Sequence, residues 1–302
     1  MNKLWRGNAR VVETRGGGEE ERGGVSVVLA HGYGASQAVW EKLVPSLSKR
    51  HNLLLFDWDF TGAGAGKDDE EAYTFGRFAD ELIAVMEERG VGASGAVVVA
   101  HSLSAMAACI AAQRRPHLFA HIFLLCASPR YINLEEEGYV GGFDEAAIHG
   151  MLAAMESDFD AWVRSFVPNA AGDASAVEHL LKSFLAMDPT VALKLAKMIF
   201  LGDQREVLDG VKTPCTIVQV KADFAAPPSV AEYMHLRMKG AATAIKIIDS
   251  VGHFPQLVAP QQLLDILAGV LRLREEAAAA AEVTEYDNAS TVEIAGGIDV
   301  SM

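Results

Sequence analysis

One serine in this sequence stands where a predicted strand gives way to a predicted helix. Ser102 follows the apolar, β-branched run 96–100 and His101, and small residues then open a helical pattern. Such a strand-to-helix turn lifts a serine hydroxyl above the end of a sheet, where a histidine can take its proton. The usual pattern G-x-S-x-G is altered, because Ala100 and Ser104 replace the glycines. A serine after a strand is also a common helix N-cap, so the turn alone leaves both interpretations open.

Two more residues with suitable chemistry follow predicted strands. Asp223 comes shortly after the apolar run 215–220, and His253 follows the run 244–248. Ser102, Asp223 and His253 therefore occur in the order serine, acid, histidine, each at the carboxyl end of a strand. This order is typical of α/β-hydrolases and differs from that of chymotrypsin-like or subtilisin-like enzymes. We predict a Ser-His-Asp triad. The alternative is a protein with the hydrolase fold whose site is catalytically inactive.

A loop suited to hold an oxyanion supports this prediction. His31-Gly32-Tyr33-Gly34 follows the apolar run 25–30, as an oxyanion loop follows its strand in α/β-hydrolases. In the predicted chemistry His253 accepts the serine proton and Asp223 fixes the imidazole tautomer. This chemistry needs no metal and no cofactor, and none is predicted. The acidic run 68–71 is interpreted as a solvated loop rather than a cation site.

Composition and charge narrow the class of protein. With 302 residues and 50% hydrophobic content, the chain can bury one large core. The net charge of −14 argues against partners such as nucleic acid or an anionic membrane surface. Three cysteines in apolar runs fit a reducing compartment without disulfides. No signal peptide is evident and no run approaches the ~18 apolar residues of a membrane span, so we expect a cytoplasmic and nuclear protein.

Strand-like and helix-like runs alternate through the first part of the chain. This alternation predicts an α/β fold with a mostly parallel, doubly wound sheet and helices on both faces. Pro45 should break or kink the first helix. Gly-rich and charged loops are expected at 15–24 and 58–73. The strands are predicted at 9–13, 25–30, 52–57, 95–100 and 121–127, and the helices at 37–49, 75–86 and 102–114.

A helical insertion interrupts the alternation. Between residues 130 and 201 no strand-like run occurs, and apolar residues at helical spacing predict four amphipathic helices. An insertion just before the acid-bearing strand is where α/β-hydrolases carry a lid, so we expect a four-helix lid at about 131–200 within a hydrolase domain of residues 1–274. Residues 275–302 hold seven acidic residues and neither Lys nor Arg, which predicts an acidic, disordered tail.

Short motifs in the chain resemble those of the plant strigolactone and karrikin receptor family of α/β-hydrolases, over about residues 8–272. The most discriminating are Ala127-Ser128-Pro129-Arg130-Tyr131 and Gly141-Gly142-Phe143. Phe56-Asp57-Trp58 and Gly252-His253-Phe254-Pro255 resemble a receptor-like side branch of that family. Further matching motifs are His31-Gly32-Tyr33-Gly34, His101-Ser102-Leu103-Ser104-Ala105-Met106, Ala154-Met155-Glu156-Ser157 and Ala161-Trp162.

The resemblance implies a small serine hydrolase with a four-helix lid. Members of that family bind butenolide-type ligands, hydrolyse some of them slowly, and signal through an F-box ubiquitin-ligase subunit and a repressor protein. Carried onto this sequence, Ser102 is the nucleophile, His253 the base and Asp223 its orienting acid, while the backbone N–H groups of Tyr33 and Leu103 form the oxyanion hole. The implied pocket residues are Tyr33, Tyr131, Phe143, Trp162, Phe166, Leu180 and Phe200.

Two departures from the family bear on the ligand. Tyr33 stands where the receptors usually have Phe, and its hydroxyl needs a partner from water, protein or ligand. We therefore expect this hydroxyl to influence ligand preference. Phe224 follows the acid where a smaller aliphatic residue is usual. Three functions stay open: a receptor-type hydrolase, which we favour; a general carboxylesterase of an unknown small substrate; and a silent interaction module, against which the intact triad speaks.

Overall fold

The computed structural model describes residues 9–13, 25–60, 73–91 and 95–276. Within them, seven strands form one sheet in the order β1-β3-β2-β4-β5-β6-β7, and neighbouring strands are parallel except β1 and β3. The predicted loop at 15–24, most of the loop at 58–73 and nearly all of the acidic tail lie outside the described residues. The strands are β1 (Ala9–Val12), β2 (Ser26–Ala30), β3 (Asn52–Phe56), β4 (Ala96–His101), β5 (Phe119–Leu125), β6 (Cys215–Ala222) and β7 (Thr243–Val251).

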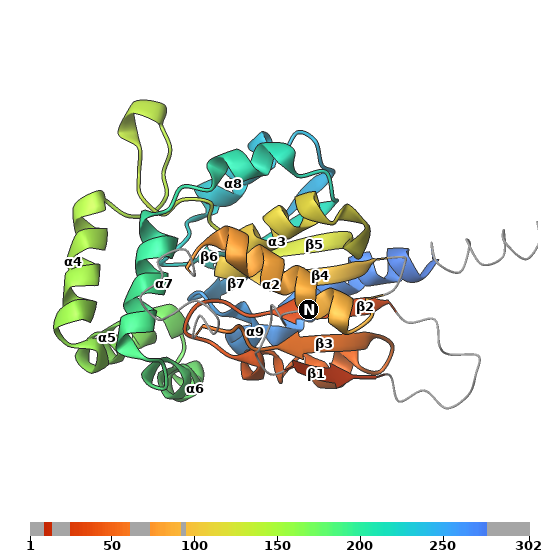
Figure 1. Ribbon diagram of the computed structural model, residues 1–302, viewed down its shortest axis with the longest axis horizontal. Coiled ribbons are helices and arrows are strands. Elements are labelled where there is room, and N and C mark those ends of the chain that lie inside the picture. Colours follow the sequence, from red (N-terminus) through yellow and green to blue (C-terminus); the bar gives the residue numbers. More distant parts are fainter. Residues whose placement is uncertain (1–8, 14–24, 61–72, 92–94, 277–302) are drawn as a thin grey trace, which may run out of the picture.

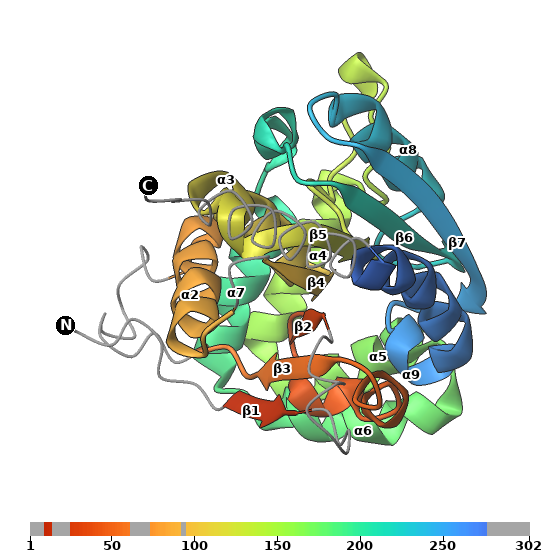
Figure 2. The same cartoon turned by 90° about the vertical axis from the view of Figure 1, so that its right-hand side faces the viewer.

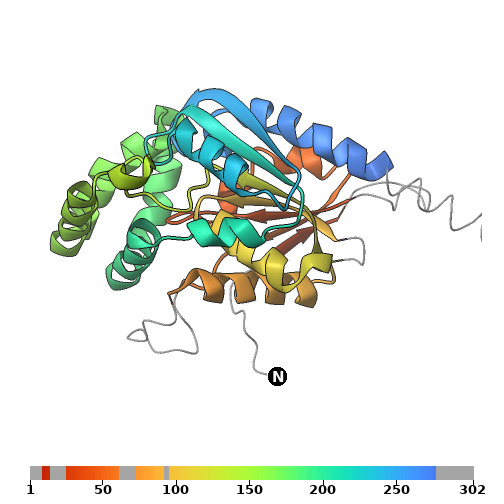
Figure 3. The same ribbon diagram turned by 90° about the horizontal axis from the view of Figure 1, so that it is seen from above.

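Helices cover both faces of the sheet, so the predicted doubly wound α/β fold is confirmed. The helices α2 (Phe75–Glu88) and α3 (Leu103–Arg114) lie on one face of the sheet (Figures 2 and 3). On the other face lie α9 (Pro255–Val258) and the helix over 260–276. With both faces covered, the central strands are mostly apolar, and all six residues of β4 are buried. Further helical elements are α8 (Pro228–Arg237), η4 (Pro116–Leu118), η5 (Glu135–Glu137) and η6 (Arg205–Gly210).

The segment predicted as one broken helix at 37–49 consists of two short pieces. A 3₁₀ helix, η2 (Gln37–Trp40), is followed by α1 (Val44–Leu47). Pro45 lies in the first turn of α1, where its missing N–H would have had no intrahelical acceptor. The proline therefore starts the second piece rather than kinking a single helix.

Four helices inserted between β5 and β6 form a separate layer at one end of the sheet (Figure 1). Asp158, Asp173 and Asp188 are the N-caps of the last three, and each side chain accepts a backbone N–H of the first turn. These caps satisfy donors that a helix start leaves free, which allows very short connections between the helices. The four helices are α4 (Glu145–Ser157), α5 (Phe159–Ala171), α6 (Ala174–Leu185) and α7 (Pro189–Leu201).

Within the described ranges, no helix combines the length and the apolar character that crossing a bilayer requires.

Candidate active site

Ser102 lies in a strained turn between β4 and α3. Its backbone angles, φ +55° and ψ −117°, are rare for any residue except glycine. Ser104, which replaces the second glycine of the usual pattern, is fully buried and donates a hydrogen bond from its hydroxyl to the His31 carbonyl. Trp58 Nε1 donates to the same carbonyl at 2.8 Å. The turn and the loop after β2 are thus fixed to each other by side chains that the sequence motif did not identify.

The three residues predicted as a triad meet at the carboxyl ends of β4, β6 and β7. His253 Nε2 lies 2.9 Å from Ser102 Oγ, and His253 Nδ1 lies 2.8 Å from Asp223 Oδ2. All three side chains are less than a tenth exposed. An acid that accepts the Nδ1 proton leaves Nε2 free to accept the serine proton. The arrangement can therefore deprotonate Ser102 during attack on a carbonyl carbon.

The carboxylate of Asp223 is held by several donors besides the histidine. The backbone N–H of Ala225 donates to Oδ1 at 2.9 Å, and that of Ala226 at 3.3 Å. Gln219 Nε2 donates to Oδ2 at 3.1 Å. These bonds fix the orientation of the acid through its own loop and strand.

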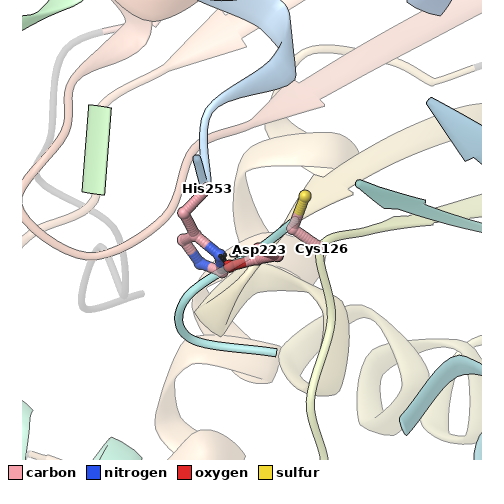
Figure 4. Close-up of side chains that lie close together, drawn as sticks. All are labelled: Cys126, Asp223 and His253. Atoms are coloured by element: carbon pink, nitrogen blue, oxygen red, sulfur yellow. Dashed lines mark hydrogen bonds and ion pairs between the residues drawn. The ribbon is translucent and has the colours of Figure 1, made fainter. Parts of the chain in front are cut away.

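Cys126 joins Asp223 and His253 in a buried cluster whose donor atoms all lie within 4.8 Å of one another (Figure 4). The separation of 2.8 Å between Nδ1 and Oδ2 is that of a hydrogen bond. Two ligands of one zinc ion, each about 2.0–2.1 Å from a tetrahedral metal, would stand roughly 3.3 Å apart. Burial also raises the pKa of the Cys126 thiol well above its ordinary value, so it stays protonated. The spacing therefore fits a shared proton and not a metal ion between acid and base.

The loop that carries His253 is anchored from two sides. His101 Nε2 donates to the His253 carbonyl at 2.7 Å, and burial lowers the pKa of His101 far enough to keep it neutral. On the other side, the His253 N–H donates to the Ala170 carbonyl of α5 at 2.8 Å. Gly252 has φ +92°, and a side chain there would meet the Ala171 carbonyl at 2.5 Å. His253 is thus positioned both by β4 and by the inserted helices.

The loop predicted to stabilise an oxyanion lies directly against Ser102. A Cβ atom on Gly32 would stand 2.8 Å from His101 Nδ1 and 3.0 Å from Ser102 Cβ, so this close approach favours glycine. Tyr33 follows it in the loop. Leu103 is the first residue of α3, where helix geometry leaves the backbone N–H without an intrahelical acceptor. Both predicted donors therefore belong to segments that border Ser102.

A small apolar cavity of about 20 Å³ lies above Ser102, between the sheet and the inserted helices, with room for about one water molecule. Four of the seven pocket residues implied by the resemblance line it: Tyr33, Tyr131, Phe166 and Phe200. Ser102 and His253 also border it, as does Phe224, which the sequence marks as unusual. The sequence gives no signal for the remaining lining residues beyond their apolar character. The full lining is Tyr33, Ser102, Tyr131, Phe166, Ala170, Phe184, Ile199, Phe200, Phe224, Ala225, His253 and Phe254.

The other three implied pocket residues lie outside this lining. Trp162 stacks on Phe166 with ring centres 4.6 Å apart. Phe143 contacts the rings of Phe200 and Phe224, and Leu180 is fully buried in α6. Trp162 and Phe143 therefore pack behind rings of the lining and do not border the cavity.

Comparison with known proteins agrees with the fold. Residues 27–266 match the model of the Alpha/beta hydrolase family. A karrikin insensitive 2 receptor from Petunia hybrida is 35% identical over 268 residues, which cover 86% of this chain and 94% of the receptor. Strigolactone esterase D14 from Arabidopsis thaliana is 34% identical over 272 residues, covering 87% and 96%.

A solved structure of a hydrolase also has this fold. A hydrolase from Oleispira antarctica has a TM-score of 0.77 and 25% sequence identity, and the match covers 90% of this chain and 96% of that one. The fold, the family match and the plant relatives agree with one another. The chain therefore belongs to the α/β-hydrolase family, in the group that includes karrikin insensitive 2 receptors and strigolactone esterases.

Proposed function

We propose that this protein is a serine esterase of the strigolactone and karrikin receptor type, with Ser102, His253 and Asp223 as its catalytic residues. The observation that carries the proposal is the line of hydrogen bonds from Asp223 through His253 to Ser102, which ends at an apolar cavity covered by the inserted helices. A serine hydroxyl buried for purely structural reasons would not need this partner geometry.

In the proposed reaction, Ser102 Oγ attacks the carbonyl carbon of an ester while its proton passes to His253 Nε2. Asp223 stabilises the resulting imidazolium. The backbone N–H groups of Tyr33 and Leu103 bind the negatively charged oxygen. The alcohol then leaves with the proton from His253, and water hydrolyses the acyl-serine by the same steps. No metal or cofactor takes part in these steps.

The proposed ligand is a small butenolide or a related ester. An aromatic, apolar lining with a few polar groups at one end suits a flat, mostly apolar molecule that presents one ester carbonyl to Ser102. The named activities of the plant relatives point to the same class. Because the cavity holds only about 20 Å³, such a ligand enters only when the lining rings or the inserted helices move.

The first experiment is hydrolysis of p-nitrophenyl acetate and of a synthetic butenolide by the wild type and by Ser102→Ala. Slow hydrolysis that depends on Ser102, together with butenolide binding by both proteins, supports the proposal. Hydrolysis that persists in Ser102→Ala excludes the catalytic assignment.

Signalling through partner proteins is the second part of the proposal and rests on the family resemblance. We propose ligand-dependent binding of an F-box ubiquitin-ligase subunit and of a repressor protein, in the cytoplasm and nucleus. The purified protein is mixed with the plant F-box subunit with and without a butenolide, and complex formation is measured. Capture that is the same with and without ligand contradicts this part.

The small cavity also favours a second candidate, a general carboxylesterase for short acyl groups. Turnover separates the two candidates. Fast hydrolysis of simple esters without butenolide binding favours the carboxylesterase, whereas slow hydrolysis with butenolide binding favours the receptor type.

A further inference from the structure

We infer that Phe224, paired with Phe166 at the mouth of the cavity, limits the size of the molecules that reach Ser102. This inference rests on the proposed function and names a specificity-determining side chain of the same site. It starts from two partly exposed aromatic side chains of the cavity lining, Phe166 and Phe224.

The cavity has one partly exposed border. Of its twelve lining residues, ten are buried, and only Phe166 and Phe224 are partly exposed. The two rings meet edge to face, with centroids 5.4 Å apart and planes at 75°. Phe166 belongs to α5 of the inserted helices, and Phe224 directly follows the acid Asp223. The route from solvent to Ser102 therefore passes between these two rings.

The two rings differ in how they are held. Phe166 stacks on Trp162 at 4.6 Å and contacts Phe184 at 5.8 Å, so it moves with the inserted helices. Phe224 lies outside those helices, and its ring stands edge-on to the His253 imidazole at 6.3 Å. Shortening Phe224 thus opens the mouth without removing a ring from the stack inside α5.

Replacing Phe224 should also leave the acid in place. Asp223 accepts hydrogen bonds from the backbone N–H groups of Ala225 and Ala226 and from Gln219. None of these bonds involves the side chain of Phe224. The geometry of the catalytic residues and the width of the mouth are therefore separable by mutation.

The consequence is selection by size. An acetyl ester needs little space beside His253, whereas a long acyl chain or a bulky leaving group must pass the Phe166–Phe224 pair. Each methylene group that an apolar site accepts or rejects changes kcat/KM by about tenfold or more. The intact pair therefore favours short acyl groups, and a smaller residue at position 224 should relax this preference.

The test compares p-nitrophenyl acetate with p-nitrophenyl octanoate. In Phe224→Val, the ratio of kcat/KM for octanoate to that for acetate should rise by about tenfold or more. Phe159→Val is the matched control, because Phe159 stacks on Trp162 in the same helix layer but does not line the cavity. An unchanged ratio in Phe224→Val, or an equal rise in Phe159→Val, overturns the inference. If Phe224→Val does not fold, Phe224→Leu is used instead.

A binding measurement keeps this inference distinct from the proposed function. A synthetic butenolide is mixed with Ser102→Ala and with Ser102→Ala/Phe224→Val in a stopped-flow instrument. The double variant should bind with an association rate about tenfold higher, because the entrance no longer depends on the movement of one ring. Equal association rates in the two variants contradict the inference that the Phe166–Phe224 pair limits entry to the cavity. Absence of Ser102-dependent hydrolysis in the wild type, with faster association in the double variant, overturns the catalytic proposal alone.

Discussion

The Tyr33 hydroxyl donates a hydrogen bond of 3.0 Å to the carbonyl of Ala192 in helix α7. Tyr33 belongs to the loop predicted to bind the oxyanion, so this bond joins that loop to the inserted helices. A second bond runs beside it, since the Ser183 hydroxyl of α6 donates to the Gly34 carbonyl. Any movement of α6 or α7 therefore acts directly on the backbone that faces Ser102.

Tyr33→Phe tests this connection. The sequence led us to expect that this hydroxyl influences ligand preference, but its partner is a backbone carbonyl of the protein. Removing it leaves that carbonyl with its helical donor alone, and the lost hydrogen bond should lower the free energy of unfolding by about 1 kcal/mol and speed amide exchange in α7. Hydrogen exchange with mass spectrometry measures this for wild type and variant. If amide exchange in α7 is unchanged but ligand preference changes, the Tyr33 hydroxyl acts on the ligand, as the sequence predicts, and not on α7.

Ser102→Ala should lower ester hydrolysis by about 10⁴-fold or more, because no other group in the proposed mechanism forms the acyl intermediate. Stability and ligand binding should change little, since the hydroxyl borders a cavity. Initial rates with p-nitrophenyl acetate and thermal unfolding measure the two effects. Ser128→Ala is the control, because it removes a buried hydroxyl that is bonded to the Arg130 carbonyl and not to His253. A similar loss of activity in both variants would indicate a structural effect.

His101→Phe should impair the positioning of His253, the proposed base. The substitution keeps a ring in the core but removes the donor to the His253 carbonyl, now 2.7 Å from His101 Nε2. Leaving that carbonyl unpaired should lower the free energy of unfolding by about 1–3 kcal/mol, and kcat should fall more than KM changes. His101→Gln offers a replacement donor and should recover part of kcat. Full activity in His101→Phe would show that the base needs no support from this side.

Glu81 makes stability depend on pH. It is 1% exposed, and burial raises the pKa of its carboxyl from 4.5 to about 7. Between these values the folded protein binds more protons than the unfolded chain, so the stability linked to this group is fully present below pH 4.5 and is lost as pH rises through 7.

Glu81→Gln should therefore be more stable than the wild type above pH 7, by an amount on the order of 3 kcal/mol, with a much smaller difference near pH 4.5. The glutamine oxygen can still accept the Asp59 N–H that now lies 2.6 Å from Glu81 Oε1. Urea unfolding at several pH values measures the difference. The exposed Glu88→Gln on the same helix is the control, and a difference that does not vary with pH would contradict the assignment.

The sequence by itself determined the fold and the identity of the catalytic candidates. Apolar periodicity is a local property, so the alternation of strands and helices and the four inserted helices could be predicted from it. The order Ser102, Asp223, His253 is a property of the chain alone. In a parallel sheet the carboxyl ends of the strands lie at one edge, so side chains that follow separate strands come together there.

Only the tertiary structure decided which rings border the cavity and what each polar group contacts. Apolar residues at helical spacing face the core whether or not they border a cavity. Periodicity therefore does not separate Phe166, which borders the cavity, from Trp162, which stacks behind it. The partner of the Tyr33 hydroxyl lies 159 residues away in the chain. Such contacts depend on rotamers and on the packing of distant elements to within about an ångström, and no local pattern encodes distances of that kind.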